Sequence, residues 1–360
     1  MASTEFVLGA TLAVQRWSDS LAVEAEKLQY FRKFMGRGDD AVIKIKTELA
    51  KKAGEKITFA LRMKMTGDGI EDDNVIEGTT AEEALTFYDD ALFIAQRRKG
   101  TKAKGKNTQQ RVPYNLREQG RNALAIWWAE DYDAQIIIYL SGARGMDTTL
   151  HVSRAFTGRA NNTIATPNAA NVIYGGDATG LANIAATDKM KLSLVERLVA
   201  KLETQDPMIQ PIRYQGEDKR ILLMHPWQAY DLRTSISQGD WLEIHKATDG
   251  VKSLVYQNAL GEYAGMILHK HRNVIRFNTA YGGCAAGITA ARALCLGAQA
   301  GMIAWGGDGR PGRYYWNEET DDRGNALAIT AGTIYGVKKT RFNSKDFGII
   351  ATDTYAADPS

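Results

Sequence analysis

The side chains whose types and spacing could support chemistry are few and scattered along the 360 residues. His269 and His271 flank Lys270, and alternate residues of a strand point the same way, so the two imidazoles could share a metal ion. No third ligand stands at a recognisable distance in the sequence. We therefore expect both histidines to face solvent, and we predict neither a metal site nor a cofactor.

Two glycine-rich strings lie between residues 282 and 312, where a small-molecule site would have to be sought. Gly307–Gly312 has the G-x-G-x-x-G spacing, in which a helix N-terminus holds a pyrophosphate. The residues after Pro311 lack the pattern of an amphipathic helix, so we do not predict a nucleotide site. Gly282–Gly287 has neither the Lys nor the Ser/Thr of a phosphate-binding loop and indicates a turn between strands.

Acids and thiols do not form a recognisable catalytic group either. Asp89 and Asp90 are neighbours on an expected strand, where they point to opposite faces and cannot share a proton. Cys284 and Cys295 lack CxxC spacing and stand among apolar or small residues, which indicates buried free thiols rather than a disulfide. These patterns favour a protein that is not an enzyme. A soluble enzyme with a small-molecule site in the region 282–312 is the alternative.

The composition is that of a folded protein with little net charge. Hydrophobic residues make up 44% and charged residues 24%, which excludes wholesale disorder. Lys and Arg number 45 against 42 Asp and Glu, so the chain as a whole is not built to wrap nucleic acid. We find no signal peptide and no uninterrupted apolar window of about 20 residues, so we expect synthesis in the cytoplasm and no membrane partner.

Residues 115–142 have the pattern of one long amphipathic helix. A single i, i+4 stripe contains Leu116, Gly120, Leu124, Trp128, Tyr132, Ile136 and Leu140. Asn115 can cap the first turn, and Gly142 suits the left-handed residue after the last turn. At roughly 1.5 Å per residue this helix would be about 40 Å long, several times the usual length. Such a rod is typical of a building block, although a long core helix of an ordinary α+β domain has the same pattern.

A wide β-hairpin precedes this helix. Residues 56–65 alternate apolar and polar side chains, and a return strand is expected at 84–96 after the turn-forming and acidic segment 66–74. A two-stranded ribbon cannot bury its apolar face by itself, so this face must lie on another surface, which can belong to a second copy. Candidates for contact between subunits, or for docking of the hairpin within one subunit, are Ile57, Phe59, Leu61, Phe87 and Phe93.

Six cations and no acid follow the hairpin between Arg97 and Lys106. Such a run typically forms a solvated loop; its other interpretations are contact with a polyanion or with the acidic Glu71–Asp73 of another subunit. Arg97, Arg98 and Lys99 complete the set of candidate contact residues. A nucleic-acid-binding module is a third hypothesis, which the absence of interleaved aromatic residues weakens.

The rest of the chain is expected to contain short elements joined by loops. We expect a short helix at 22–34, an extended loop at 147–187 and a second helix at 188–204. Further helices are expected at 226–231 and 241–246, and strands at 220–225, 263–269, 292–299, 326–337 and 347–354.

Seven segments, in their order along the chain, carry a resemblance to a known family. They are Phe34–Gly36, Leu85–Asp90, Asn115–Gly142, Leu222–Leu232, Gly261–Gly265, Leu296–Ala300, and Tyr335–Lys339 with Lys345–Gly348. Together they resemble the major capsid proteins of N4-like tailed bacteriophages, from about residue 34 to about residue 354. No single motif is specific; the order of the segments carries the likeness.

The resemblance implies an α+β protein with the Hong Kong-97-type capsid fold. The implied parts are an N-terminal arm (1–50), an extended β-hairpin loop (51–114), a peripheral domain with a spine helix (115–189), an axial domain (190–315) and C-terminal strands that return to the peripheral domain (316–360). The implied function is structural: self-assembly, as hexamers and pentamers, into the icosahedral shell of a phage around double-stranded DNA. Implied partners are portal, scaffolding or cement proteins and, without sequence specificity, packaged DNA. The protein would be made in the cytoplasm of the host bacterium and would reside in the virion capsid.

Overall fold

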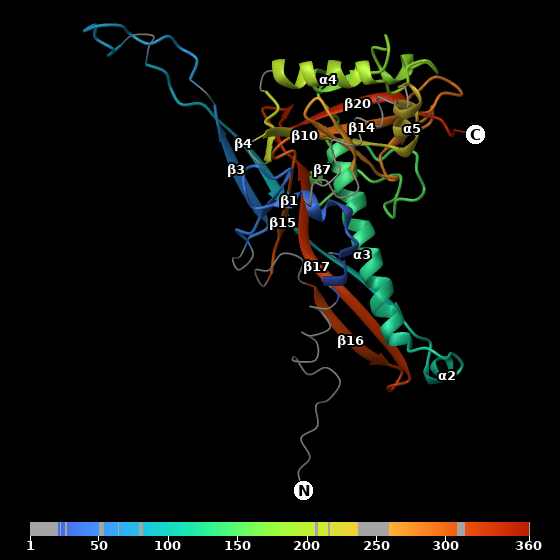
Figure 1. The fold of residues 1–360 in the computed structure, drawn as a ribbon. Coiled ribbons are helices and arrows are strands. Elements are labelled where there is room, and N and C mark those ends of the chain that lie inside the picture. The colour runs from blue at the N-terminus through green and yellow to red at the C-terminus, as the bar shows by residue number, and fades with distance from the viewer. Residues whose placement is uncertain are drawn as a thin grey trace.

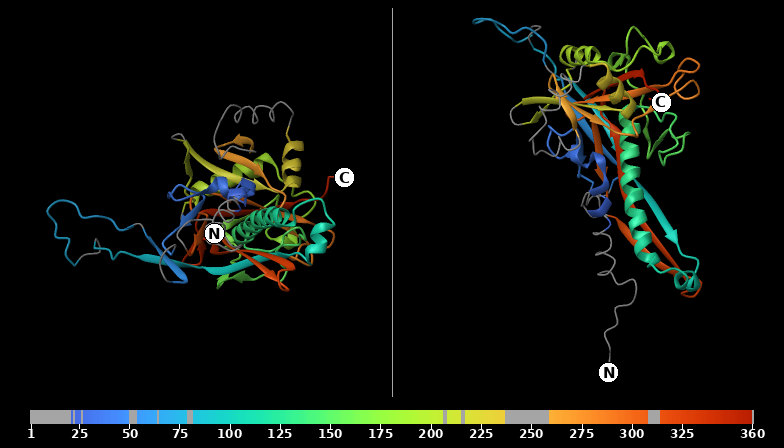
Figure 2. Two further views of the ribbon diagram at one scale, coloured as in Figure 1. Left: turned by 90° about the horizontal axis from the view of Figure 1, so that it is seen from below. Right: turned by 45° about the vertical axis from the view of Figure 1, so that its right-hand side comes forward.

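The computed structural model describes residues 21, 23–25, 27–49, 54–63, 65–78, 82–205, 208–214, 217–236, 259–307 and 314–359. An elongated body carries a wider block at one end (Figure 1). Helix α3 (Leu116–Ser141) runs along the body into the block. The hairpin of β3 (Lys56–Arg62) and β4 (Phe87–Phe93) leaves the body beside the block and projects outward, away from the opposite end of the body (Figure 2). Helices and mixed sheets are both present, which confirms the α+β class.

Helix α3 begins and ends where its caps predict. The side chain of Asn115 accepts a hydrogen bond of 3.0 Å from the amide of Arg117. Gly142 has φ 67°, and a Cβ there would lie 2.2 Å from the carbonyl oxygen of Ala165, so a larger residue does not fit. The predicted stripe is buried except for Leu116, which is partly exposed. From Trp128 onward only Glu130 is exposed, because the block encloses this half of the helix.

The body contains a sheet built around the long strand β17 (Ala326–Lys339). One edge of β17 pairs antiparallel with β5 (Ala95–Lys102). The other edge carries β15 (Gly301–Trp305) and β16 (Tyr315–Asp321) end to end, both antiparallel. β2 (Ile43–Lys46) pairs in parallel with β15, and β1 (Met35–Gly36) in parallel with β2. One face of this sheet packs against α3.

The block is built on an eight-stranded sheet. Its strands are β11 (Ala259–Tyr263), β12 (Met266–Lys270), β10 (Glu217–Met224), β14 (Ala290–Leu296), β20 (Ile349–Tyr355) and β8 (Val172–Tyr174), with β9 (Ile212–Tyr214) on β10 and β13 (Arg276–Phe277) on β14. Helix α4 (Leu192–Thr204) lies above the sheet and the end of α3 below it (Figure 1). Alternate residues of β10 serve the two sides: Leu222 and Met224 pack toward α4, Ile221 and Leu223 toward α3.

The remaining elements are short. They are η1 (Tyr30–Phe34), α2 (Lys106–Gln110), β6 (Gly158–Arg159), β7 (Asn162–Thr163), η2 (Ala169–Asn171), η3 (Leu181–Asn183), α5 (Pro226–Thr234), β18 (Arg341–Phe342) and β19 (Lys345–Asp346). No helix among the described residues is long and apolar enough to cross a membrane.

Several expected elements differ from the prediction. The strand expected at 263–269 is two strands, because Ala264 and Gly265 have positive φ and form a turn. The helix expected at 22–34 ends by Leu28 and is followed by the separate turn η1. β20, expected among strands that return to the peripheral domain, instead pairs with β14 in the block. The helix expected at 241–246 lies outside the described residues.

A buried ion pair joins the block to the end of α3. Arg292 of β14 donates two hydrogen bonds, of 2.7 and 2.6 Å, to the carboxylate of Asp353 on β20. Its third guanidinium nitrogen donates to the carbonyl oxygen of Ser141, the last residue of α3, at 2.9 Å. Carbonyls in the last turn of a helix have no partner within the helix, so this contact satisfies one of them. One guanidinium therefore connects two strands and the helix.

We expect Arg292→Met to lower the unfolding free energy of the unassembled chain by about 3–5 kcal/mol, because it leaves Asp353 buried without its partner. Urea unfolding followed by circular dichroism measures this loss. Arg233→Met changes an exposed arginine of α5 and should stay within about 0.5 kcal/mol of the wild type. Equal losses in the two variants would contradict the role of the ion pair.

Helix α5 begins with a capping box. The ring of His225 accepts a hydrogen bond of 3.2 Å from the amide of Trp227, and the side chain of Gln228 accepts one of 2.9 Å from the amide of His225. Burial, aided by the positive charge of Arg276, lowers the pKa of His225 to about 4. The capping nitrogen accepts a hydrogen bond only while it carries no proton, so protonation removes the cap.

This capping box predicts a pH dependence of stability. The pKa of His225 is lower in the folded chain than the ordinary value of about 6.5, so its contribution is complete above that pH and is lost as pH falls toward 4. His225→Ser keeps an acceptor at the cap but does not titrate. Between pH 6.5 and 4.5 the wild type should lose about 2 kcal/mol more unfolding free energy than His225→Ser, measured by denaturant unfolding at both pH values. Equal losses would refute this assignment.

Candidate assembly surface

Of the two histidines with metal-ligand spacing, His269 is buried and His271 is half-buried, so the prediction that both face solvent is wrong. His269 is fully buried at the end of β12, and its Nδ1 lies 3.4 Å from the ammonium of Lys33. Burial, with the nearby charge of Lys33, lowers the pKa of His271 to about 4. The described residues contain no group of three or more side chains that could hold a metal ion. The histidine rings instead support the N-terminal segment.

That N-terminal segment is held by a carboxylate of the long helix. Asp133 accepts hydrogen bonds from the amides of Tyr30 and Phe31, at 2.8 and 3.1 Å. The ring of Tyr30 lies 4.5 Å from that of His271. Burial raises the pKa of Asp133 to about 7. The described arm residues therefore pack on their own subunit, at the junction of α3 and the block.

The other sequence motifs that could support chemistry form no site in the described residues. Gly282–Gly287 lies in the connection between β13 and β14, which confirms the predicted turn. Only Gly307 of the string Gly307–Gly312 lies within the described residues. Cys284 and Cys295 are buried and unpaired, which confirms the prediction of free thiols. Burial raises the pKa of Cys295 to about 12, so this thiol is not a nucleophile at neutral pH.

One face of the hairpin lies on its own subunit. Ile57 and Leu92, which are paired across the two strands, are buried against Met302 and Ala304 of β15. Phe59, next along this face, meets the ring of Phe342 edge-on, with centroids 5.8 Å apart. Leu61 follows and lines a small apolar hollow with Phe342 and Phe347. Asp90, on the same face, pairs with Lys338 of β17. This inner face is therefore buried at Ile57 and Leu92 and partly covered at Phe59 and Leu61 within one chain.

The other face of the hairpin is open, and it carries two of the predicted contact residues. Pairing of Lys56 with Phe93 and of Arg62 with Phe87 places both phenylalanines on the face opposite to Ile57. Phe87 is 58% exposed. The five candidate contact residues are thus divided between the two faces of the hairpin. The return strand presents its phenylalanines outward because Tyr88, Asp90 and Leu92 point inward.

The loop that connects β3 and β4 is acidic and exposes large apolar side chains. Its described residues, 65–78 and 82–86, contain seven acids and no base. Val75 is 72% exposed and Ile76 54% exposed, although isoleucine and valine are usually buried. The amide of Thr66 donates to the carboxylate of Glu83 at 2.9 Å, which closes the base of the loop. The loop therefore exposes apolar and negatively charged side chains far from the body.

The basic run after the hairpin is largely a strand, so the predicted solvated loop is wrong for residues 97–102. Arg97 of β5 points at α3, where it forms an ion pair with the fully buried Asp131. Arg97 and Lys99 both lie over the ring of Trp127, at 4.8 and 5.3 Å from its centroid. Arg98, between them, is exposed. Arg97 is therefore committed to α3, whereas Arg98 and Lys99 are both exposed.

The sequence does not identify Asp131 as the ion-pair partner of Arg97. Asp131 also accepts hydrogen bonds from Gln135, at 2.7 Å, and from the hydroxyl of Tyr335, at 3.0 Å. Burial and the neighbouring carboxylate raise the pKa of Tyr335 well above its ordinary value, so its hydroxyl stays protonated. In the sequence, Asp131 stands outside the apolar stripe, as a solvated residue would. Its burial depends on β5 and β17, which no local pattern indicates.

Comparisons with known proteins agree on one family. The family described as "Phage capsid protein" matches residues 5–358. The major capsid protein of Pseudomonas phage KPP25 is 26% identical over 362 residues, which cover 93% of each chain. The capsid of Ralstonia phage GP4 is 40% identical, with a TM-score of 0.86 over 100% of both chains. The capsid of cyanophage Pam1 is 20% identical, with a TM-score of 0.70 over 99% of this chain and 95% of that one.

Proposed function

This chain belongs to the phage capsid protein family, and we infer from this that it is the major capsid protein of a tailed bacteriophage, the subunit of an icosahedral shell. The match spans nearly the whole chain, so it covers the arm, the hairpin, the long helix and both sheets. The expected Hong Kong-97-type fold is confirmed. Its role is structural. The order of the seven segments named above supports the further proposal that the phage is N4-like.

We assign the parts of the fold as follows. The N-terminal arm is 1–50, the extended loop 51–114, the peripheral domain with α3 as spine helix 115–189 and the axial domain 190–315. Of the C-terminal segment 316–360, only residues 316–339 return to the peripheral domain. Strands β16 and β17 support this last assignment because they lie beside α3. β20 belongs with the axial sheet.

The observation that carries the assembly proposal is the uncovered outer face of the hairpin with its connecting loop. Phe87, Val75 and Ile76 are exposed in the single chain, and they lie on an extension that the body does not reach (Figure 2). We propose that a second copy covers them. Contact between two different surfaces of one subunit is heterologous, and repeated rotation closes such contacts into rings. Rings of six and five are what an icosahedral shell requires.

We propose three further sets of partners. Portal proteins and scaffolding or cement proteins would bind the shell. The subunit would also bind packaged DNA without sequence specificity. The exposed side chain of Arg98 supports this contact because it can pair with a phosphate. Charged groups that contact only phosphates give salt-dependent binding that does not depend on sequence. We propose that the protein is made in the host cytoplasm and acts without enzymatic activity.

The proposal predicts different effects for two phenylalanines on opposite faces of the hairpin. Phe87→Glu alters an exposed side chain, so the unfolding free energy of the subunit should change by less than about 0.5 kcal/mol while shell formation fails. Phe59→Glu places a charge against Phe342 within the subunit and should cost about 1–3 kcal/mol of unfolding free energy as well. Urea unfolding measures the unfolding free energy of each variant, and sedimentation with negative-stain electron microscopy measures shell formation.

Phe87→Leu is the matched control, because it keeps an apolar side chain at the same place and should assemble. Normal particle yield from Phe87→Glu would contradict the assignment of this residue to an interface. The function itself is tested on the unaltered chain: closed shells, or flat rings of five or six, are expected in negative stain. A chain that stays monomeric at every concentration and salt condition tested would overturn it.

A further inference from the structure

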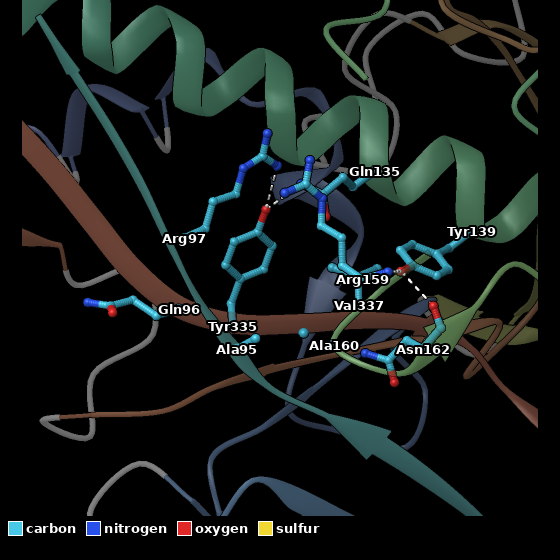
Figure 3. Close-up of a pocket in the computed structure, with 11 residues that line it drawn as sticks. Ala95, Gln96, Arg97, Gln135, Tyr139, Arg159, Ala160, Asn162, Tyr335 and Val337 are labelled. Carbon is cyan, nitrogen blue, oxygen red and sulfur yellow. Dashed lines mark hydrogen bonds between the residues drawn. The ribbon is translucent and has the colours of Figure 1, made fainter. Parts of the chain in front are cut away.

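A cavity of about 240 Å³ lies where the hairpin joins the body. β4 ends at Phe93 and β5 begins at Ala95, and the cavity lies beside this break. Its walls come from β5, α3, the turn between β6 and β7, and β17 (Figure 3). The polar side chains that line it are those of Arg97, Gln135, Tyr139, Arg159, Asn162 and Tyr335. In Figure 3 the side chains of Arg97 and Arg159 both point into the cavity.

Most of these polar groups have partners within the chain. Arg97, Gln135 and the hydroxyl of Tyr335 all donate to Asp131, which lies behind the wall. The hydroxyl of Tyr139 donates to the carbonyl oxygen of Asn162, at 2.9 Å. The side chain of Asn162 exchanges two hydrogen bonds with the backbone of Phe93, at 3.0 and 2.7 Å. These groups form a rigid, satisfied wall.

Arg159 is the exception. Its Nε is buried and has no hydrogen-bond partner in the described part of the chain. The ring of Phe156, 5.4 Å from the guanidinium carbon, supports the flat face of the group but cannot accept its in-plane N–H bonds. Ala160 and Asn161 have φ of 52° and 60°, so a tight turn fixes the direction of the side chain. Its amide donates to the hydroxyl of Tyr139, at 2.8 Å, which fixes the backbone as well.

The charges of the cavity do not balance. Two guanidinium groups point into it, no acid is among its described lining residues, and Asp131 behind its wall is already paired with Arg97. An arginine fork with free in-plane donors binds a planar carboxylate or a phosphate through two parallel hydrogen bonds. Water can fill such a space but cannot neutralise the second positive charge. We propose that this cavity binds one oxyanion, a carboxylate or a phosphate group, on the fork of Arg159 and beside Arg97.

An oxyanion there would connect the β6–β7 turn to β5 at the point where the extended loop leaves the body. Two sources supply this chemistry: free phosphate in the cell, or an Asp or Glu side chain of a second copy in the shell. In both cases the recognised group is the same. The bound anion would stiffen the junction between the hairpin and α3.

Calorimetry on the unassembled full chain tests the site, with inorganic phosphate and acetate as probes at constant ionic strength. We expect saturable binding to the wild type that is weakened about tenfold or more in Arg159→Gln, since hydrogen bonds to a charged group are lost. Arg159→Lys keeps the charge without the fork and should show an intermediate loss. Arg233→Gln removes an exposed cation of α5, which does not line the cavity, and should bind as the wild type does. Unfolding midpoints of all variants establish that each is folded.

Assembly in the presence and absence of phosphate separates the two sources. If the source is free phosphate, shells formed in phosphate carry an isolated anion at Arg159, and phosphate raises their yield. If the source is an acidic side chain of a second copy, phosphate lowers the yield and Arg159→Gln assembles poorly even without phosphate. The proposal is overturned if Arg159→Gln binds both probes as Arg233→Gln does, or if neither probe binds the wild type. Because binding is measured on unassembled chains, its result stands apart from whether shells form.

Discussion

The rest of the structure depends on how the C-terminal end of α3 is held. The helix is about 39 Å long, and its far half is covered on one side only, so its direction is set at its enclosed end. There Arg292 connects Asp353 to the carbonyl of Ser141, and apolar residues of both sheets share one core with the last turns of the helix. A small rotation at this joint would move the far tip by many ångströms.

Two further carboxylates, both on α3, hold the extensions of the chain. Asp131 receives Arg97 of the strand that follows the hairpin, and Asp133 receives the amides of the N-terminal segment. Hydrogen bonds to a buried charge have a defined direction, and breaking one leaves that charge uncompensated. Apolar contact alone lacks this directionality. The extensions are therefore oriented by polar contacts near the helix, whereas their exposed parts carry the apolar groups available for association.

The sequence predicted those features that depend on local pattern and failed where distant partners decide. Both caps of α3 and the existence of the hairpin follow from residue type and period. Which residues of the return strand face the body does not follow from the sequence, because Phe87 and Leu92 are both apolar. The register with β3 and the ion pair of Asp90 with Lys338 determine that Leu92 points toward the body and Phe87 away from it. His269 looked solvated because its partners, Lys33 and Phe34, lie more than 200 residues away in sequence. The likeness to a family came from the order of segments, not from any site.

The two faces of the hairpin explain how one chain can be stable before assembly and still associate. Ile57 and Leu92 fix the root of the ribbon on β15, so the extension is ordered in the free subunit and loses little conformational freedom on association. If the extension became ordered only on contact, the entropy lost in ordering it would weaken the binding free energy of every interface. Were both faces covered within one chain, however, the hairpin would offer no apolar surface for the proposed contact with a second copy. Phe87, which we propose as a contact residue, is exposed in the single chain, and the solubility of the free subunit limits how many such residues it can carry.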